Sequence, residues 1–165
     1  MSLTRSCQLV ALVLTALLMA TAFGHVLEMP VKMNVPGPAW LSFQQTLYPA
    51  FSILGEPIEL CAVAAAVVLA FLMRREKAMR RDKGWFGLTL TAAALLAVSF
   101  FGIWLGLVHP VNARTALWTA ASMPPDWSRW RDQWELSQAA RFILQFLAFY
   151  ALASSILVKN RNPYS

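Results

Sequence analysis

The stretch PAFSILGEPIELCAVAAAVVLAFLM, residues 49–73, is almost entirely apolar, and Glu56 and Glu59 are its only charged residues. A helix of this length can cross a hydrocarbon core of about 30 Å. Three more segments share this character, at residues 8–29, 85–108 and 137–158. A spanning segment must satisfy its own backbone hydrogen bonds, and none of the four alternates as a barrel strand does. The sequence therefore predicts an all-α protein with four membrane-spanning helices.

The composition of the whole chain agrees with this prediction. Hydrophobic residues make up 58% of the 165 residues and charged residues 13%, about half the charged fraction of an average soluble domain. Such a composition excludes a water-soluble enzyme and a disordered chain. The length fits one domain, so residues 1–165 are predicted to form a single transmembrane domain with the lipid bilayer as its main partner.

The basic residues predict how the chain is oriented. The net charge of +6 alone would suggest nucleic-acid binding, but six of the basic residues lie in one connection, residues 74–83. The other connections, residues 30–48 and 109–136, hold few basic residues or balance them with acidic ones. The positive-inside rule then predicts no nucleic-acid partner and an up-down-up-down four-helix bundle. Both termini and residues 74–83 would be cytoplasmic, as in a multi-pass protein of the bacterial inner membrane.

The first span has a second interpretation. Arg5, the apolar run after it and the small residues 20–22 also resemble a signal peptide with its cleavage site. Against cleavage, the hydrophobic character continues from Phe23 to Met29. His25 and Glu28 then lie one helical turn apart, as on a retained helix.

The two outer connections contain aromatic residues and helix breakers. Pro30, Pro36 and Pro38 are predicted to end any helix early in the first connection. In the last connection, Asp126 is a plausible start of a helix. Aromatic residues favour the membrane interface, so Trp40, Tyr48, Trp127, Trp130 and Trp134 are predicted to form an aromatic belt.

Polar residues recur at helical spacing within the spans, although ionisable groups there are costly and usually face the bundle interior. We expect one polar seam on each helix, with the four seams meeting at one depth on the outer side. Arg141 needs a carboxylate, and Glu59 is its predicted partner. Gly102 and Gly106 are expected to allow close helix contact. The four seams are Thr21, His25 and Glu28; Ser52, Glu56 and Glu59; Gly102, Gly106 and His109; and Trp134, Gln138, Arg141 and Gln145.

Three interpretations of this polar cluster stay open. It is an internal salt-bridge network without chemistry, a metal site, or a pocket in which His or Glu acts as a base beside a cationic Arg. For a metal, the only relevant spacing is His25-x-x-Glu28, which is weak evidence, and no nucleotide-binding loop or haem-attachment motif occurs. The sequence thus predicts no cofactor and leaves a metal weakly supported.

Trp40 and seven short motifs form one pattern along the chain: GHVLEMPVK (24–32), QQTLY (44–48), GEPIE (55–59), PVN (110–112), PDW (125–127), RDQWE (131–135) and AAR (139–141). This pattern resembles the anthrone oxygenase-like family of small membrane proteins, most of which are uncharacterised. The resemblance extends over nearly the whole chain, roughly residues 10–158. One position departs from the family pattern, because Gln138 stands where a His commonly follows the Glu matched by Glu135.

The resemblance implies oxidation of a polycyclic anthrone to an anthraquinone without a recognised cofactor. In this chain His25 or Glu59 would be the base, and Arg141 or Asn112 would stabilise the oxyanion. The substrate slot and its surroundings would be formed by Trp104, Trp118, Trp134, Glu28, Glu56, His109 and Gln138. The alternative is a non-catalytic accessory subunit or carrier of a lipophilic small molecule, and the oligomeric state stays open.

Overall fold

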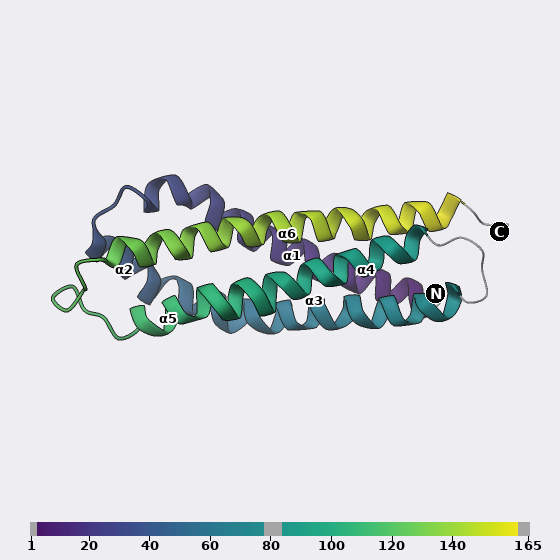
Figure 1. Cartoon of the computed structure of the whole chain (residues 1–165), viewed down its shortest axis with the longest axis horizontal. Coiled ribbons are helices and arrows are strands. Elements are labelled where there is room, and N and C mark those ends of the chain that lie inside the picture. Colours follow the sequence, from purple (N-terminus) through teal and green to yellow (C-terminus); the bar gives the residue numbers. More distant parts are fainter. Residues whose placement is uncertain (1–2, 78–83, 162–165) are drawn as a thin grey trace.

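The computed structural model describes residues 3–77 and 84–161, and all the regular structure within them is helical (Figure 1). Helices α4, η1 and α5 follow one another without a break and form one long helix. The elements in chain order are α1 (Leu3–Lys32), α2 (Gly37–Thr46), α3 (Tyr48–Lys77), α4 (Gly84–Ala97), η1 (Val98–Val108), α5 (His109–Thr115) and α6 (Trp127–Arg161).

Four helices are long and apolar enough to cross a membrane: Leu3–Lys32, Tyr48–Arg75, Gly84–Thr115 and Trp127–Val158. Each contains one of the predicted apolar segments, so the prediction of four such helices is confirmed by their length and composition. The four lie side by side, and each packs against two others in the order α1, α3, α4, α6 (Figure 1). The first residues of α1 and the last of α6 lie at one end of this bundle. Helices α2 and α5 lie at the opposite end, which we call the α2 end.

The long helices extend beyond the predicted segments. Helix α1 continues through Pro30 to Lys32, so the predicted break at Pro30 is wrong. A proline removes only one backbone hydrogen bond, a loss that a helix held by its neighbours can tolerate. The predicted connection 109–136 is largely helical, since it contains α5 and the beginning of α6. Of the predicted basic loop 74–83, residues up to Lys77 are helical, and residues 78–83 lie outside the described part of the chain.

Helix η1 has π-type geometry, in which the backbone N–H of His109 donates to the carbonyl oxygen of Trp104, five residues earlier. This wider turn keeps side chains four residues apart on one face, and Phe100, Trp104 and Val108 are all buried. The rings of Phe100 and Trp104 are stacked, with centroids 5.3 Å apart and planes 4° apart. π-type segments are frequent at functional sites, so the buried face of η1 is a candidate location for a functional site.

The π-type turns of η1 also place the predicted seam of Gly102, Gly106 and His109 on the outer side of the bundle. Gly102 and Gly106 are exposed, and in residues 3–77 and 84–161 a Cβ placed at either would meet no atom of another helix within 4 Å. The expected close helix contact at these glycines is therefore wrong. The buried face of η1 carries Ser99 and Trp104 instead.

Side chains from distant parts of the chain fix the α2 end. Gln45 donates from Nε2 to the carbonyl oxygens of Thr115 and Trp118, each at 2.8 Å, and so satisfies groups at the end of α5. Arg131 Nη1 donates to the carbonyl oxygen of Met33 at 2.9 Å, just beyond α1. Trp40 in α2 is completely buried. The α2 end is therefore a packed cap on the bundle.

The predicted aromatic belt is wrong for three of its five members. The exposed fractions of Trp40, Tyr48 and Trp134 are 0%, 5% and 2%, so these rings belong to the protein core. Each has a polar partner inside the protein, and a satisfied indole N–H or phenol O–H allows an aromatic ring to be fully buried.

Gly37 permits the close approach of α2 to the start of α6. A Cβ at this position would lie 2.7 Å from Met123 Sδ and 2.8 Å from Trp127 Cε2. We expect Gly37→Ala to lower the free energy of unfolding by about 1–3 kcal/mol, as overpacking does, in thermal unfolding of the detergent-solubilised protein. Gly24→Ala is the matched control, since a Cβ there meets no atom within 4 Å. Equal stability of the two variants would contradict this packing.

Candidate functional site

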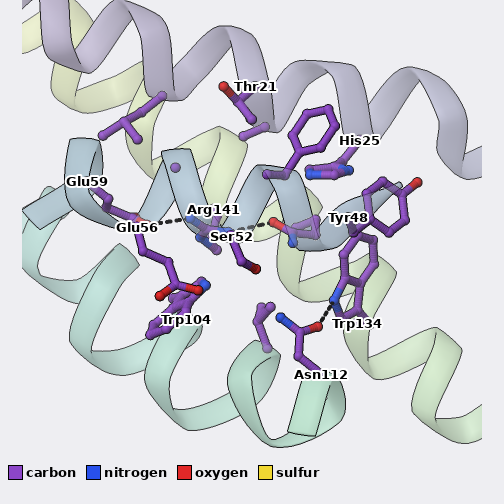
Figure 2. A pocket seen from close by; sticks show the side chains of 16 residues that line it. Thr21, His25, Tyr48, Ser52, Glu56, Glu59, Trp104, Asn112, Trp134 and Arg141 are labelled. Carbon is purple, nitrogen blue, oxygen red and sulfur yellow. Dashed lines mark hydrogen bonds and ion pairs between the residues drawn. The ribbon is translucent and has the colours of Figure 1, made fainter. Parts of the chain in front are cut away.

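A cavity of about 50 Å³ lies among the four long helices near the α2 end (Figure 2). At about 30 Å³ per water molecule, it has room for one or two waters. Its walls come from α1, α3, the η1–α5 segment and α6. They consist of Leu18, Thr21, Ala22, His25, Tyr48, Phe51, Ser52, Gly55, Glu56, Glu59, Trp104, Val108, Asn112, Trp134, Gln138 and Arg141.

Most of the predicted site residues meet at this cavity. Three do not line it, namely Glu28, His109 and Trp118. Glu28 bonds to a wall residue, Trp118 lines a neighbouring pocket, and His109 is exposed, with its ring 5.2 Å from that of Trp104. The expected inward seam through His109 is therefore wrong, because the π-type turns direct Trp104 inward in its place. The predicted residues that line the cavity are His25, Glu56, Glu59, Trp104, Asn112, Trp134, Gln138 and Arg141.

The predicted pairing of Glu59 with Arg141 is confirmed. Arg141 Nη2 lies 2.5 Å from Glu59 Oε2, and Arg141 Nη1 donates to Gln138 Oε1 at 2.7 Å. The other Glu59 oxygen accepts bonds from Ser99 Oγ at 3.1 Å and from Gln145 Nε2 at 3.2 Å. Only 1% of Glu59 is exposed. Because its carboxylate is fully used in joining α3, η1 and α6, Glu59 is poorly suited to act as a base.

The other predicted base, His25, is in a different state. Its ring is packed among Tyr48, Phe51 and Trp134, with centroids 5.0, 5.4 and 5.1 Å away. Within residues 3–77 and 84–161, its Nδ1 atom has no hydrogen-bond partner, and Glu28 Oε2 is 3.8 Å away. A fixed imidazole at a cavity wall, with a ring nitrogen unbonded, can take a proton from a bound molecule.

Asn112 is oriented by Trp134. The indole Nε1 of Trp134 donates to Asn112 Oδ1 at 2.8 Å. An indole N–H can only donate, so the oxygen of the amide must face Trp134 and the NH₂ group must face elsewhere. Asn112 lines the cavity and is thereby set to donate hydrogen bonds to a ligand.

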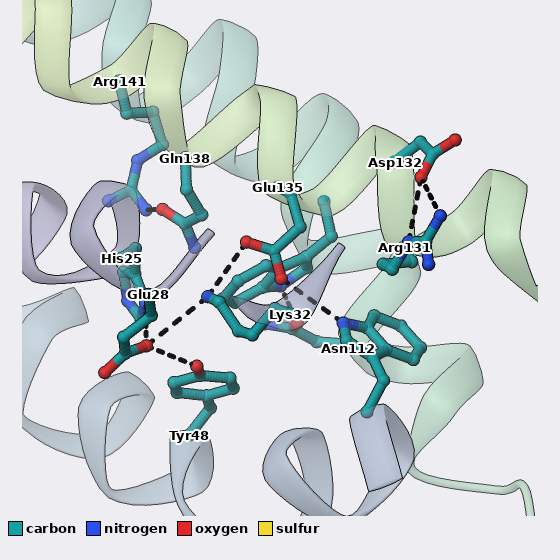
Figure 3. A network of polar contacts seen from close by, with 12 residues as sticks. His25, Glu28, Lys32, Tyr48, Asn112, Arg131, Asp132, Glu135, Gln138 and Arg141 are labelled. Atoms are coloured by element: carbon teal, nitrogen blue, oxygen red, sulfur yellow. Dashed lines mark hydrogen bonds and ion pairs between the residues drawn. The ribbon is translucent and has the colours of Figure 1, made fainter. Parts of the chain in front are cut away.

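A second ionic network lies beside the cavity and centres on Lys32 (Figure 3). Lys32 is 2% exposed, and its Nζ lies 2.9 Å from Glu135 Oε2 and 3.4 Å from Glu28 Oε2. It also lies over the rings of Tyr48 and Trp134, 5.0 and 4.7 Å from their centroids. This buried cation was not predicted from the sequence. The signal was present, because Lys32 follows Glu28 by four residues and extends the seam of α1.

Two aromatic donors complete this network. Tyr48 Oη donates to Glu28 Oε2 at 2.6 Å, and Trp40 Nε1 donates to Glu135 Oε1 at 3.3 Å. The network thus joins α1, α2, α3 and α6. Its carboxylates, like Glu59, are bound within the protein.

A larger pocket of about 510 Å³ adjoins the cavity on the side of α2. Tyr48, Ser52 and Asn112 line both spaces. The size lies in the range of pockets that bind small organic molecules, about 300–1,000 Å³. The rest of its wall is formed by Gln44, Gln45, Pro49, Thr115, Ala116 and Trp118.

In residues 3–77 and 84–161, no three or more His, Cys, Asp or Glu side chains gather in a way that could hold a metal ion. Comparisons with protein-family models, curated proteins and solved structures found no match to this chain. The resemblance to anthrone oxygenase-like proteins thus rests on the seven short motifs of the sequence.

The ion pair of Glu59 with Arg141 should be the main polar support of the bundle. Arg141→Ala leaves a buried carboxylate without its cation, which typically costs about 3–5 kcal/mol. We expect a correspondingly large loss in thermal stability, and Glu59→Gln added to Arg141→Ala should restore part of it. Arg129→Ala, an exposed arginine on the same helix, is the control and should have little effect. Equal stabilities of the Arg141 and Arg129 variants would show that the pair is not structural.

Proposed function

We propose that this chain is a multi-pass protein of the bacterial inner membrane that oxidises a lipophilic aromatic ketone or phenol with O₂, as the anthrone oxygenases it resembles do. One observation carries the proposal: an unbonded imidazole and an oriented amide meet at one cavity that adjoins a pocket of organic-ligand size. We further propose an up-down-up-down arrangement with both termini cytoplasmic and the α2 end outside. The distribution of basic residues supports this orientation.

The proposed chemistry requires only a base, an oxyanion donor and O₂. The base removes a benzylic proton next to the ring carbonyl, and the resulting enolate is electron-rich. The enolate passes one electron to O₂, and the two radicals combine to form a peroxide at that carbon. The protonated base returns its proton to the outer peroxide oxygen. Loss of water, made from that oxygen, the returned proton and the second benzylic hydrogen, then leaves the quinone carbonyl. One oxygen atom thus enters the product and the other leaves as water.

We assign these roles to cavity residues from the hydrogen bonds that each one makes. His25 is the base, because Glu59 is held by Arg141, Ser99 and Gln145. Asn112 is the oxyanion donor, because its amide nitrogen is directed away from Trp134. Preorganised donors of this kind stabilise charge that develops in the transition state.

The volumes indicate where a substrate would lie. The inner cavity of about 50 Å³ suits a molecule as small as O₂ or water, whereas the pocket of about 510 Å³ suits an aromatic ring system. A substrate in the larger pocket would present its reacting carbon at the shared wall of Tyr48, Ser52 and Asn112. No cofactor is needed for this reaction, and elemental analysis of the purified protein tests the alternative of a metal.

The second candidate is a non-catalytic accessory subunit or carrier. The observation that favours it is the internal pairing of Glu59, Glu135 and Lys32, which a purely structural network would also show. Turnover separates the two candidates, because a carrier would bind an aromatic ketone without forming a quinone.

We expect the purified protein to convert a hydroxyanthrone to its quinone under air, followed by quinone absorbance against a heat-killed control. His25→Ala should lower the rate by about a hundredfold, the lower end of what a general base contributes. Added imidazole should restore part of the activity by filling the space left by the side chain. His109→Ala should keep the activity, because His109 is exposed and outside the cavity. If only the His109 variant lost activity, the base would be His109 and not His25.

The orientation predicts the behaviour of alkaline phosphatase fusions, since this enzyme is active only outside the cytoplasm. A fusion after residue 80 should be inactive, and one after residue 120 should be active. The opposite pattern would invert the orientation.

A further inference from the structure

A groove of about 440 Å³ opens from the cavity region between α3 and η1. Ser52 and Glu56 line both the groove and the cavity, so the two spaces meet at these residues. The other groove residues are Ile53, Pro57, Leu60 and Phe100.

The outer edge of the groove is apolar and lies within a membrane-spanning length of helix. The exposed fractions of Ile53 and Leu60 are 72% and 52%, and both belong to the span Tyr48–Arg75. Exposed aliphatic residues in a spanning helix contact lipid tails, so this groove faces the bilayer.

Glu56 lies at the inner end of the groove, on the wall that the groove shares with the cavity (Figure 2). It is half-buried, and in residues 3–77 and 84–161 its carboxylate forms no hydrogen bond or ion pair. Glu59, three residues later, is fully bonded. An unpaired carboxylate within a span is costly and usually functional. The oxygens of a carboxylate accept hydrogen bonds, so a complementary ligand donates one.

Pro57 adds a second acceptor to the same groove. It has no N–H to bond the carbonyl of Ile53, four residues earlier in α3. The groove therefore combines an apolar edge with hydrogen-bond acceptors, and its one side-chain donor among the lining residues is the hydroxyl group of Ser52.

We infer that the groove between α3 and η1 is a lateral entrance through which a membrane-dissolved aromatic hydroxyl compound reaches the cavity, where Glu56 accepts a hydrogen bond from its hydroxyl group. The ligand class rests on the proposed function, in which the substrate is a phenol or the enol form of an aromatic ketone. A neutral hydroxyl suits this place better than an ammonium ion, because the ligand must first dissolve in the hydrocarbon core.

Thiol labelling in proteoliposomes tests the route. Ser52→Cys, in a protein with Cys7→Ala and Cys61→Ala, puts one thiol at the junction of the cavity, the groove and the larger pocket. N-phenylmaleimide dissolves in the bilayer, whereas a trimethylammonium methanethiosulfonate arrives only from water. Leu60→Trp fills the groove and should slow N-phenylmaleimide labelling about tenfold, or about 1.4 kcal/mol of added barrier. The charged reagent should react as before.

Val67→Trp is the matched control for this test. Val67 lies on the same helix, has the same exposed fraction of 52% and does not line the groove. It should change neither labelling rate. An equal effect of the two tryptophans, or no effect of Leu60→Trp, would overturn the lateral entrance.

Ligand uptake tests the role of Glu56. The excess of 1-naphthol in proteoliposomes over protein-free liposomes measures binding, and naphthalene is the probe that lacks the hydroxyl. Glu56→Ala breaks no bond within the described residues, so it should fold. It should weaken 1-naphthol binding about tenfold and leave naphthalene binding unchanged. Similar responses of the two probes would overturn the assignment of Glu56.

Neither measurement depends on turnover. A protein that labels and binds as expected but forms no quinone would contradict the proposed oxidation and leave the entrance intact. A protein that forms quinone with unchanged labelling rates would contradict only the entrance.

Discussion

A charge within an apolar membrane-spanning helix is costly unless it is paired inside the protein, and the bond of Glu59 to Arg141 removes that cost for the deepest carboxylate of α3. The pair fixes the rotation of α3 and α6, since each side chain can reach its partner from only one face of its helix. With Glu59 directed inward, Ser52, seven residues earlier, also faces the cavity. Glu56 falls at the edge of the same face, where α3 meets η1. The positions of the other polar groups of α3 thus follow from this one contact.

Pairing also decides which polar groups are free for chemistry. Lys32 is shared by Glu28 and Glu135. Tyr48 donates to the same Glu28 oxygen, Oε2, and Trp40 donates to the other Glu135 oxygen, Oε1. Besides Nε of Arg141, the groups at the cavity without a hydrogen-bond partner in residues 3–77 and 84–161 include Nδ1 of His25, the carboxylate of Glu56 and the amide NH₂ of Asn112. These three groups can take a proton, accept a hydrogen bond and donate one. That combination is what a base-assisted reaction of an aromatic ketone or phenol needs, and a purely structural network would not require it.

Much of this arrangement could be predicted because it depends on local rules. Apolar length predicts the four long helices, and helical spacing predicts that His25, Glu59 and Arg141 face a common interior. Their partners and surroundings were harder to predict. Because of the π-type turns of η1, Trp104 lines the cavity and the expected His109 does not. The sequence contains no clear signal for such turns. Lys32 falls within the predicted connection 30–48, yet it is buried. Its burial requires Glu135, about a hundred residues later in the chain.

The central claim is that the cavity region binds an aromatic ketone or quinone beside His25. The chain contains only two histidines, so ¹⁵N-histidine labelling gives an NMR spectrum with His25 as the reporter and His109 as an internal control. With the protein in lipid nanodiscs and anthraquinone as the added ligand, the ring-nitrogen resonances of His25 should shift. Those of the exposed His109, assigned with His109→Gln, should stay in place. A spectrum in which only His109 responds, or in which neither histidine does, would contradict the claim.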